Sequence, residues 1–363
     1  MNIVVALVVA VLLSFAISAL LGTKMVPWLH KLKFGQTILD IGPNWHKQKQ
    51  GTPTMGGLMF IISTIVTFLI VVLIDALTGH DIVGTNVTSE LIGATATAGA
   101  AKAKIWGGLI MAFGFGLIGF ADDYIKIKKK QNEGLTVLQK TVLQLILCAA
   151  YIATLALSKN TYMYLPLHHS YWDYGNLFWF CIITFIIMYA TVNAVNFTDG
   201  IDGLCGSVTI TAAIAFCVMA IFHHVLGASI LAAALAGALG GYLIWNWHPA
   251  KCFMGATGSM FLGGMMVALA YALDCPLILL LTGIIYVIEG ASDVIQIAYF
   301  KVTKKIAQRK DPNATGKRLF KMAPIHHSFE LSGWSEEKIC IVFSIVNLLG
   351  GVASCLIFYF GDK

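Results

Sequence analysis

Charged residues are scarce in this sequence of 363 residues, of which 12% are charged and 58% are hydrophobic. So few charges cannot cover a water-facing surface, and the composition excludes a disordered chain and a coiled coil, both of which are rich in charge. The eight cysteines include no C-x-x-C pair and show no regular spacing, which excludes a secreted disulfide scaffold and indicates packing residues. The sequence therefore predicts an integral membrane protein.

Long apolar runs are what the chain contains instead. Ten of them approach the ~20 residues that a helix needs to span a bilayer core. The longest connecting segments, 22–54 and 300–338, are too short to fold separately, and there is no internal repeat or low-complexity tract. We therefore expect a single all-α transmembrane domain over residues 1–363 with ten spanning helices. The runs are Asn2–Leu21, Met55–Ile74, Ile105–Ala121, Val137–Leu157, Leu177–Val195, Gly203–Phe222, Val225–Trp245, Gly255–Leu273, Pro276–Tyr299 and Ile339–Phe360.

Lysine and arginine are distributed unevenly between the connecting segments. The five segments that follow an odd-numbered run carry 19 of the 24 positive residues, the other segments and both tails carry four, and Lys140 lies inside a run. Because short positively charged loops stay in the cytoplasm, this asymmetry places those five segments inside and both termini outside. The net charge of +6 is accordingly interpreted as a signal of topology, and we expect no nucleic-acid partner.

Ionisable side chains beside the spanning runs gather at this cytoplasmic face. Such groups cost about 2.5 to 3.5 kcal/mol each at a helix centre, so their positions point towards function. Asp122, Lys126 and Lys130 are spaced i, i+4, i+8 after the third run and share a face if the helix continues. One interpretation is an ordinary charged helix end. The other is that Asp122 and Asp123 supply a base or hold a divalent cation while the lysines neutralise phosphate.

A second polar series ends the fifth run. Asn193, Asn196, Asp199 and Asp202 follow one another at intervals of three residues, so four polar side chains line one slowly turning helical edge. Turn chemistry explains the aspartates and glycines of this segment but not two asparagines that extend back into an apolar run. The pattern favours a functional interpretation.

Three further segments carry candidate binding groups. In 49–57, glycines permit close backbone approach and Lys49 with the hydroxyls can bind an anion, although helix entry and tight packing explain them equally well. Phe253 offers a stacking face for a base, or anchors the chain at the membrane interface. His326 and His327 lie beside a glutamate and can donate to phosphate or act as acid or base, or serve a structural role.

Glu289 and Asp293 differ from these groups because they lie four residues apart, well inside the ninth apolar run. Carboxylates at that depth should face the protein interior or a watery cleft rather than lipid. A role in packing, as hydrogen-bonded neutral acids, and a role in catalysis remain equally open for them.

The chain resembles the phospho-N-acetylmuramoyl-pentapeptide transferases in five segments that occur in the expected order over essentially its whole length: GTPTMGG, ADDYIK, NFTDGIDGL, FMGATGS and PIHHSFE. This family belongs to the polyprenyl-phosphate N-acetylhexosamine-1-phosphate transferase superfamily. The resemblance implies a multi-pass enzyme of the bacterial cytoplasmic membrane. It further implies a reaction at the cytoplasmic face in which undecaprenyl phosphate attacks UDP-N-acetylmuramoyl-pentapeptide to give lipid I and UMP in peptidoglycan synthesis. The resemblance also implies Mg²⁺ as cofactor and a homodimer.

The resemblance further implies roles by position. The catalytic positions are Asp122, Asp123, Asp199 and His326, with Asp122 as the base for the lipid phosphate and Phe253 as the platform for uracil. The substrate-binding positions are Lys49, Thr54, Lys126, Lys130, Lys140, Asn196, Asp202, Asn246, Phe253, Gly255, Gln296 and His327.

Two positions depart from the family pattern. Ser328 stands where a third histidine is usual. Ala256 stands where the FMGDxGS segment of the family carries the aspartate that binds magnesium, and alanine has no side-chain donor atom. The resemblance therefore implies impaired activity for this chain, while the family assignment is unaffected.

Two other functions remain open from the sequence. Ten helices with carboxylates inside the membrane are compatible with an ion-coupled transporter or lipid flippase, although the polar clusters gather at one face and the halves show no repeat. A related enzyme would transfer a different sugar phosphate from its UDP conjugate to a polyprenyl phosphate, as at the start of teichoic acid or O-antigen synthesis.

Overall fold

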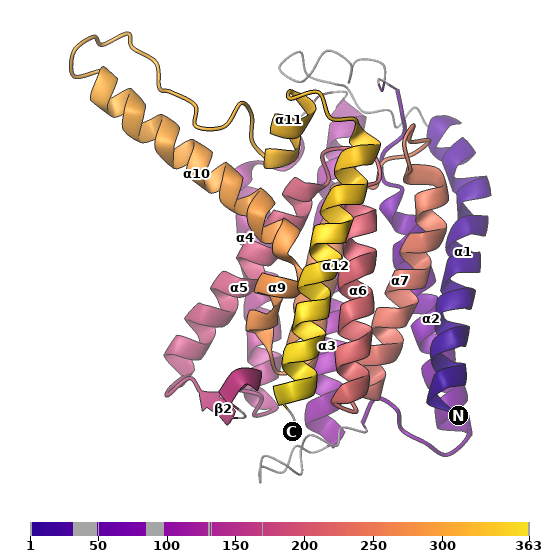
Figure 1. Ribbon diagram of the computed structural model, residues 1–363. Helices are drawn as coiled ribbons and strands as arrows, with labels where there is room; N and C mark the ends of the chain where they lie inside the picture. The colour runs from indigo at the N-terminus through magenta and orange to yellow at the C-terminus, as the bar shows by residue number, and fades with distance from the viewer. Residues whose placement is uncertain are drawn as a thin grey trace.

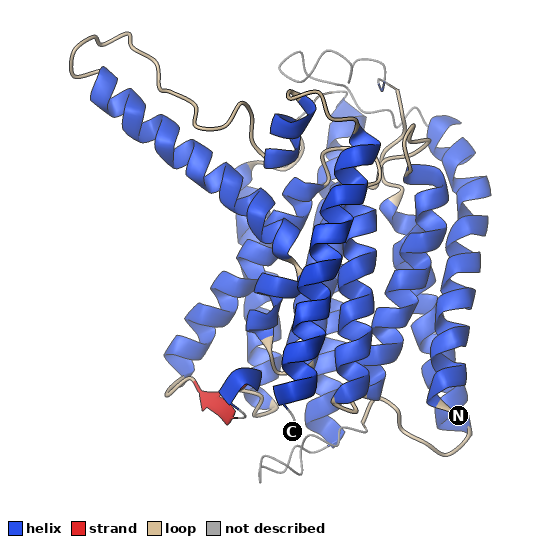
Figure 2. Cartoon of the chain, viewed as in Figure 1, coloured by secondary structure: helices blue, strands red, loops and turns tan. Residues whose placement is uncertain are grey.

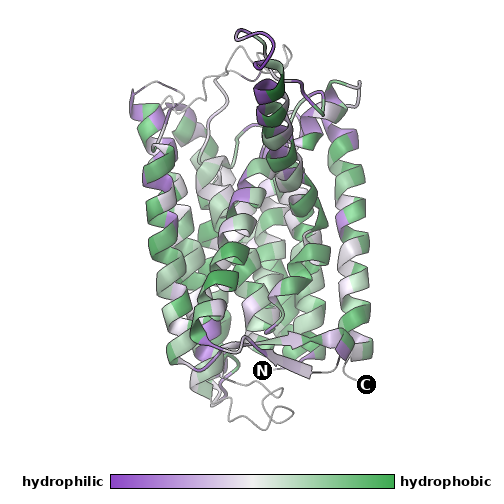
Figure 3. Cartoon of the chain, turned by 90° about the vertical axis from the view of Figure 1, so that its left-hand side faces the viewer, coloured by the Kyte–Doolittle hydropathy of each residue, from purple (hydrophilic) through white to green (hydrophobic). Residues whose placement is uncertain are grey.

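Nine helices of the chain are long and apolar enough to cross a membrane, within residues 2–31, 49, 51–84, 98–129, 131, 133–168 and 170–361, which are those that the computed structural model describes. They are α1 (Ile3–Lys31), α2 (Gly57–Leu77), α3 (Ala98–Lys129), α4 (Val137–Leu157), α5 (Leu177–Thr198), α6 (Leu204–Phe222), α7 (Leu226–Asn246), α8 (Gly255–Ala272) and α12 (Glu336–Gly361). Figure 3 shows apolar residues along the walls of the bundle and hydrophilic residues at its ends. The prediction of an all-α polytopic membrane protein is confirmed.

The ninth apolar run departs from its prediction as one straight spanning helix. It forms the short helices η4 (Pro276–Ile278) and α9 (Leu279–Thr282), and then α10 (Ile284–Ala307), with a bend of 89° between the two parts. Gly283 lies at the break, where an added Cβ would lie 2.8 Å from the Tyr286 ring and 3.0 Å from the Leu279 carbonyl. After this break α10 leaves the bundle obliquely (Figure 1).

The two termini lie at one end of the bundle, opposite the end that carries the short helix α11 (Ile325–Glu330) (Figure 1). If the bent pair forms one span, the described residues contain up to ten candidate spans, and this even number agrees with two termini at the same end. The end that carries α11 is called the α11 end below.

Helices α3 and α8 pack against each other through small residues. A Cβ added to Gly119 would collide with the backbone of Ala256, and one added to Gly108 would lie 2.7 Å from the Cβ of Ala268. Such contacts let helix backbones approach closely where no hydrophobic effect drives helices together. As a result, the last turns of α3, including Asp123, lie against the first turn of α8.

A small β-hairpin, which the sequence analysis did not predict, lies at the end of the bundle opposite the α11 end (Figure 2). Strands β1 (Tyr162–Leu165) and β2 (Ser170–Asp173) pair antiparallel, with the short helix η3 (Pro166–His168) between them. The N–H of Tyr164 donates to the carbonyl of Asp274 at 2.6 Å, and the Asp274 carboxylate lies 2.6 Å from the buried Lys104 ammonium. The hairpin therefore covers a buried ion pair.

Candidate active site

Asp122 binds the end of α3 to the segment that follows it. Its carboxylate accepts from the Lys126 ammonium at 2.7 Å and from the backbone N–H of Leu135 at 2.9 Å. Asp122 is buried, whereas about a third of the Lys126 side chain remains exposed (36%). The predicted i, i+4 pair is present, and it places the Lys126 ammonium at the border between the protein and solvent.

Asp123 caps the first turn of α8. Its oxygens accept from the backbone N–H groups of Ala256 at 3.2 Å and Thr257 at 2.9 Å, and from the Thr257 hydroxyl at 2.8 Å. The first N–H groups of a helix have no partner within it, so a buried carboxylate from another helix satisfies them. Gly255 has a φ of 70°, and a Cβ there would collide with Asp123 and with Thr54. The glycine thus allows the three segments to meet.

Asp199 adds a third carboxylate from the C-cap of α5. Burial, followed by the neighbouring carboxylates of Asp123 and Asp202, raises the pKa of Asp199 to about 8, and the opposing influence of Lys126 is smaller. Lys140, near the start of α4, also interacts electrostatically with Asp123. These residues share one electrostatic environment that favours the binding of positive charge.

Lys49 links three distant parts of the chain. Its ammonium lies 2.7 Å from Asp202 Oδ1 and 2.6 Å from Glu336 Oε2. The other Asp202 oxygen accepts from the Ala250 N–H at 2.9 Å and lies 3.2 Å from His248 Nδ1. Asp202, His248 and Glu336 have the donor spacing of a metal site, but Lys49 already supplies a cation to two of them.

Sequence reasoning missed Glu336 and His248. The available signals were weak: an acidic first turn on the last spanning helix and a histidine in the segment between the seventh and eighth runs. Neither signal indicates which residue the side chain contacts, because the partners lie far away in the sequence.

Two predicted substrate-binding amides hold the loops of the site together. Asn246 donates to the carbonyl of Cys252 at 2.9 Å and accepts from the N–H of Gly203 at 3.2 Å, which joins the α7–α8 segment to the α5–α6 segment. Gln296 accepts from the two N–H groups of residues 319–320 at 3.0 Å each. Both amides therefore have a structural role in this arrangement.

The position of Phe253 is set by its backbone. Its N–H donates to the carbonyl of Pro53 at 2.8 Å, and its own carbonyl accepts from the N–H of Gly56 at 2.8 Å. The half-buried ring is thereby carried on two loops that support each other. Asn196 accepts from the Ser259 hydroxyl at 2.8 Å and so links the end of α5 to α8.

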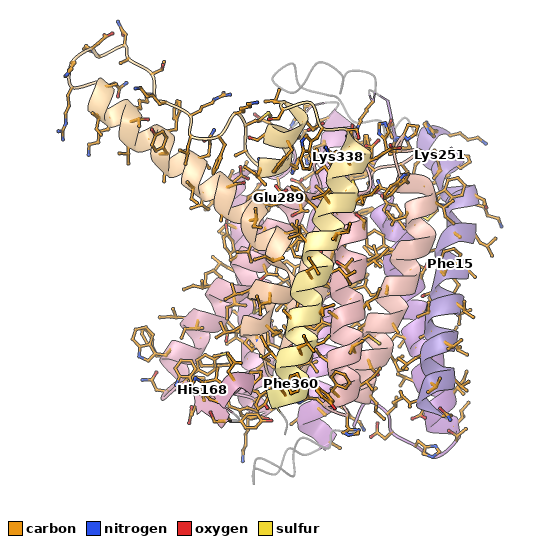
Figure 4. All side chains as sticks on the ribbon, in the orientation of Figure 1. Phe15, His168, Lys251, Glu289, Lys338 and Phe360 are labelled. Atoms are coloured by element: carbon orange, nitrogen blue, oxygen red, sulfur yellow. The ribbon has the colours of Figure 1, made fainter. Side chains whose placement is uncertain are left out.

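Each of the two histidines is held by a glutamate. His326 Nδ1 lies 2.9 Å from Glu289 Oε2, with both side chains fully buried, and His327 Nδ1 lies 2.6 Å from Glu330 Oε2. Figure 4 shows Glu289 where α10 leaves the bundle. The prediction that Glu289 faces the protein interior is confirmed. Ser328, at the position of the usual third histidine, bonds to the backbone of residue 322 through its hydroxyl.

The side chains that could hold a divalent cation form an incomplete set. The carboxylates of Asp122 and Asp123 are engaged by protein donors, and Ala256 contributes only its N–H, which points at Asp123. Magnesium is usually held by one or two carboxylates together with substrate phosphates. This chain therefore does not fit a firmly bound magnesium ion at position 256. Lys130, another predicted site residue, lies outside the described residues.

The arrangement as a whole suits chemistry on phosphate. Lys126 and Lys140 bring positive charge to one end of the bundle, beside adjacent carboxylates that can accept a proton. Phosphoryl transfer depends mainly on positioning and on neutralising charge, and both can be supplied by such side chains.

Comparisons with known proteins agree with this chemistry. A model of glycosyl transferase family 4 matches residues 105–274, and signature 1 of the phospho-N-acetylmuramoyl-pentapeptide-transferases matches residues 49–61. The phospho-N-acetylmuramoyl-pentapeptide-transferase of Clostridium acetobutylicum is 40% identical over 345 residues, 94% of this chain and 96% of its own. The transferase of that name from Carboxydothermus hydrogenoformans is 40% identical over 94% of this chain and 95% of its own. For that from Clostridium perfringens strain 13 the values are 42%, 94% and 96%. Since similarity at this level extends over nearly the whole of both chains, this protein belongs to the phospho-N-acetylmuramoyl-pentapeptide-transferase family.

Proposed function

We propose that the protein transfers phospho-N-acetylmuramoyl-pentapeptide from its UDP conjugate to undecaprenyl phosphate, forming lipid I and releasing UMP in peptidoglycan synthesis. The observation that carries the proposal is the group formed by Asp122, Asp123, Asp199 and Lys126 at one end of a membrane bundle of this family. An acidic group beside lysines provides both a proton acceptor and neutralisation of phosphate charge.

The chemical step exchanges one P–O bond for another. A phosphate oxygen of the lipid forms a bond to the phosphorus that carries the sugar, and the bond from that phosphorus to UMP breaks. Asp122 is our proposed base for the lipid phosphate. Its carboxylate lies beside the Lys126 ammonium, whose positive charge would attract that phosphate. Lys126 and Lys140 then neutralise charge on the phosphates.

The uridine end of the substrate is proposed to lie on Phe253. Stacking a base on an aromatic ring is favourable, and the ring is held by the two loops described above. Lys49 and Asp202 provide a hydrogen-bond donor and an acceptor near the Phe253 loop. The Asp202 carboxylate is joined to that loop because it accepts from the N–H of Ala250. His326 and His327 are proposed to act near the diphosphate or sugar.

The α11 end is proposed to face the cytoplasm, in the cytoplasmic membrane of a bacterium, with the protein acting as a homodimer. Support for the orientation comes from the connecting segments after odd-numbered runs, which carry 19 of the 24 positive residues. Short positive loops remain on the cytoplasmic side.

Magnesium is proposed as the cofactor of the form that carries aspartate at position 256. In that form the ion would supply charge neutralisation to the phosphates. The chain with Ala256 lacks this side-chain ligand, and we propose that its transferase activity is impaired.

A comparison of two donor substrates tests the proposal directly. The purified Ala256→Asp variant is incubated with polyprenyl phosphate, magnesium and either UDP-N-acetylmuramoyl-pentapeptide or UDP-N-acetylglucosamine. Lipid I and UMP are expected only from the first donor. Product from the second donor alone would assign a different sugar, and no product from either would contradict a transferase.

A binding measurement tests the nucleotide site separately. Phe253→Ala should weaken uridine nucleotide binding about tenfold, because base stacking on an aromatic ring is worth about 1 to 3 kcal/mol. Unchanged affinity in calorimetry with folded protein would return Phe253 to a membrane-anchoring role.

A further inference from the structure

The first two turns of α12 hold the Asp202 peptide from both sides. Its N–H donates to Glu336 Oε2 at 3.0 Å, and its carbonyl accepts from the Cys340 thiol at 3.1 Å. The same Glu336 oxygen accepts from the Lys49 ammonium at 2.6 Å. Glu336 thus contacts both the amide of Asp202 and the ammonium that Asp202 pairs with.

Charge balance does not account for this glutamate. One ammonium requires one carboxylate, and Asp202 already lies 2.7 Å from Lys49. A second carboxylate adds negative charge beside a site that is proposed to receive an anionic nucleotide, and the half-exposed His248 lies farther from Glu336, at 3.8 Å. If negative charge were the main contribution of Glu336, this residue would repel the substrate.

Geometry does account for it. A lysine side chain is long and has many rotamers, so a single exposed ion pair orients it weakly. Here the Asp202 and Glu336 side chains are 2% and 8% exposed, so two buried oxygens fix an ammonium whose side chain stays 17% exposed. The ammonium is therefore held in place from the protein side.

We propose that Glu336 is a positioning residue for uridine recognition, which acts by holding the Lys49 ammonium at a fixed place beside the Asp202 carboxylate. A donor beside an acceptor complements the edge of uracil, which presents carbonyl oxygens next to an N–H. This inference rests on the proposed function, since it assumes that the site receives a uridine nucleotide.

Uridine itself is the suitable probe, because it is neutral and its binding does not report the change in local charge. Calorimetry on the purified full-length protein compares the parent with Glu336→Gln, Glu336→Asp and Lys49→Met, and with the double variant Lys49→Met, Glu336→Gln. Glu337→Gln is the matched control, because Glu337 is the adjacent, exposed acid on the same helix. Thermal unfolding of each variant establishes that it is folded.

We expect Glu336→Gln to weaken uridine binding about tenfold, in line with the loss of one hydrogen bond to a charged group. Glu336→Asp should recover part of the affinity, and Glu337→Gln should match the parent. In the Lys49→Met background the Glu336 substitution should change the affinity by about twofold at most, because the residue through which Glu336 acts is gone.

Two results would overturn the inference while leaving the proposed function intact. One is a Glu336→Gln variant that binds uridine as tightly as the parent. The other is an equal loss with and without Lys49, which would show that Glu336 only stabilises α12. A parent that binds neither uridine nor UMP would overturn the proposed function, and this inference with it.

Discussion

A carboxylate introduced at position 256 should create magnesium-dependent activity in this chain. Ala256 is the second residue of α8, and its N–H lies 3.2 Å from Asp123, so a side chain there begins beside an existing carboxylate. Disturbing even the outer partners of a metal site costs ~10 to 100-fold in affinity or activity. Loss of a direct ligand should cost at least as much, so Ala256→Asp should raise the rate of lipid I formation by about two orders of magnitude.

The same substitution should also be visible in stability, independently of turnover. Without metal, the new carboxylate gains about 0.3 to 1 kcal/mol from the N-terminus of α8. Against this gain it meets the charge of Asp123, in an environment where the pKa of Asp199 is already raised to about 8. We expect Ala256→Asp to unfold at a lower temperature than the parent in a chelator. Magnesium at about 100 times its dissociation constant should then add about 2.7 kcal/mol.

The assay is a magnesium titration of product formation and of the thermal midpoint, with equal amounts of folded protein. Ala256→Asn is the control, because it places a polar side chain of similar size at the same position without a charge. Equal turnover by the parent and Ala256→Asp across the titration would refute the metal assignment, and so would equal stabilisation of the two by magnesium. In that case Asp122, Asp123 and Asp199 would be the better candidates for ligands.

Three further predictions follow from other parts of the molecule. In a background without accessible native thiols, His168→Cys should react with an impermeant reagent from outside the cell and Lys338→Cys should not; the reverse pattern would invert the topology. The pKa of Asp199 is raised to about 8 in the folded protein, so its protonated form stabilises the fold. This stabilisation is fully present below the ordinary pKa of about 4 and is lost as the pH rises through 8. Asp199→Asn should therefore flatten the fall in thermal midpoint between about pH 4 and 8, and parallel curves would exclude this residue as the cause. Asp274→Asn leaves the buried Lys104 ammonium unpaired and should cost about 3 to 5 kcal/mol of unfolding free energy. Adding Lys104→Met should recover part of this loss in detergent-based unfolding, and a further loss would argue against the ion pair as its source.

The spanning helices were predictable because their signal is local. The run Val137–Leu157 coincides with α4, where Thr136 and Gln139 form a capping box that ends the loop before it. The bend in the ninth run was not predictable in the same way. Gly283 sits in a continuous apolar stretch, and hydropathy does not distinguish a straight helix from one that turns by 89°.

The hairpin was missed for a related reason. Its strands have four residues each, and their alternation is too short to stand out between apolar runs. The backbone bond from Tyr164 to Asp274 is a contact between segments far apart in the sequence. Local propensity contains no information about such a partner.

For the site, the sequence identified segments but not their contacts. Asp122 and Asp123 are adjacent, and the residue pattern alone gave them the same two candidate roles, yet one pairs with Lys126 and the other caps α8. The difference arises from the crossing of α3 and α8, which brings the second carboxylate to a helix end. Likewise, Lys49 and Glu336 are 287 residues apart, so their contact depends on how the whole bundle closes.

The capping role of Asp123 explains how the fold can accommodate alanine at position 256. The donors that Asp123 satisfies are two backbone N–H groups and a threonine hydroxyl, none of which requires a side chain on Ala256. Helix α8 consequently keeps its cap, and Gly255 still allows the approach of Thr54. The structure therefore separates two demands on this corner of the protein. Backbone groups and Asp123 hold the helices together without a side chain at position 256, so the proposed exchange of alanine and aspartate there is expected to alter cation binding and leave the helix bundle in place.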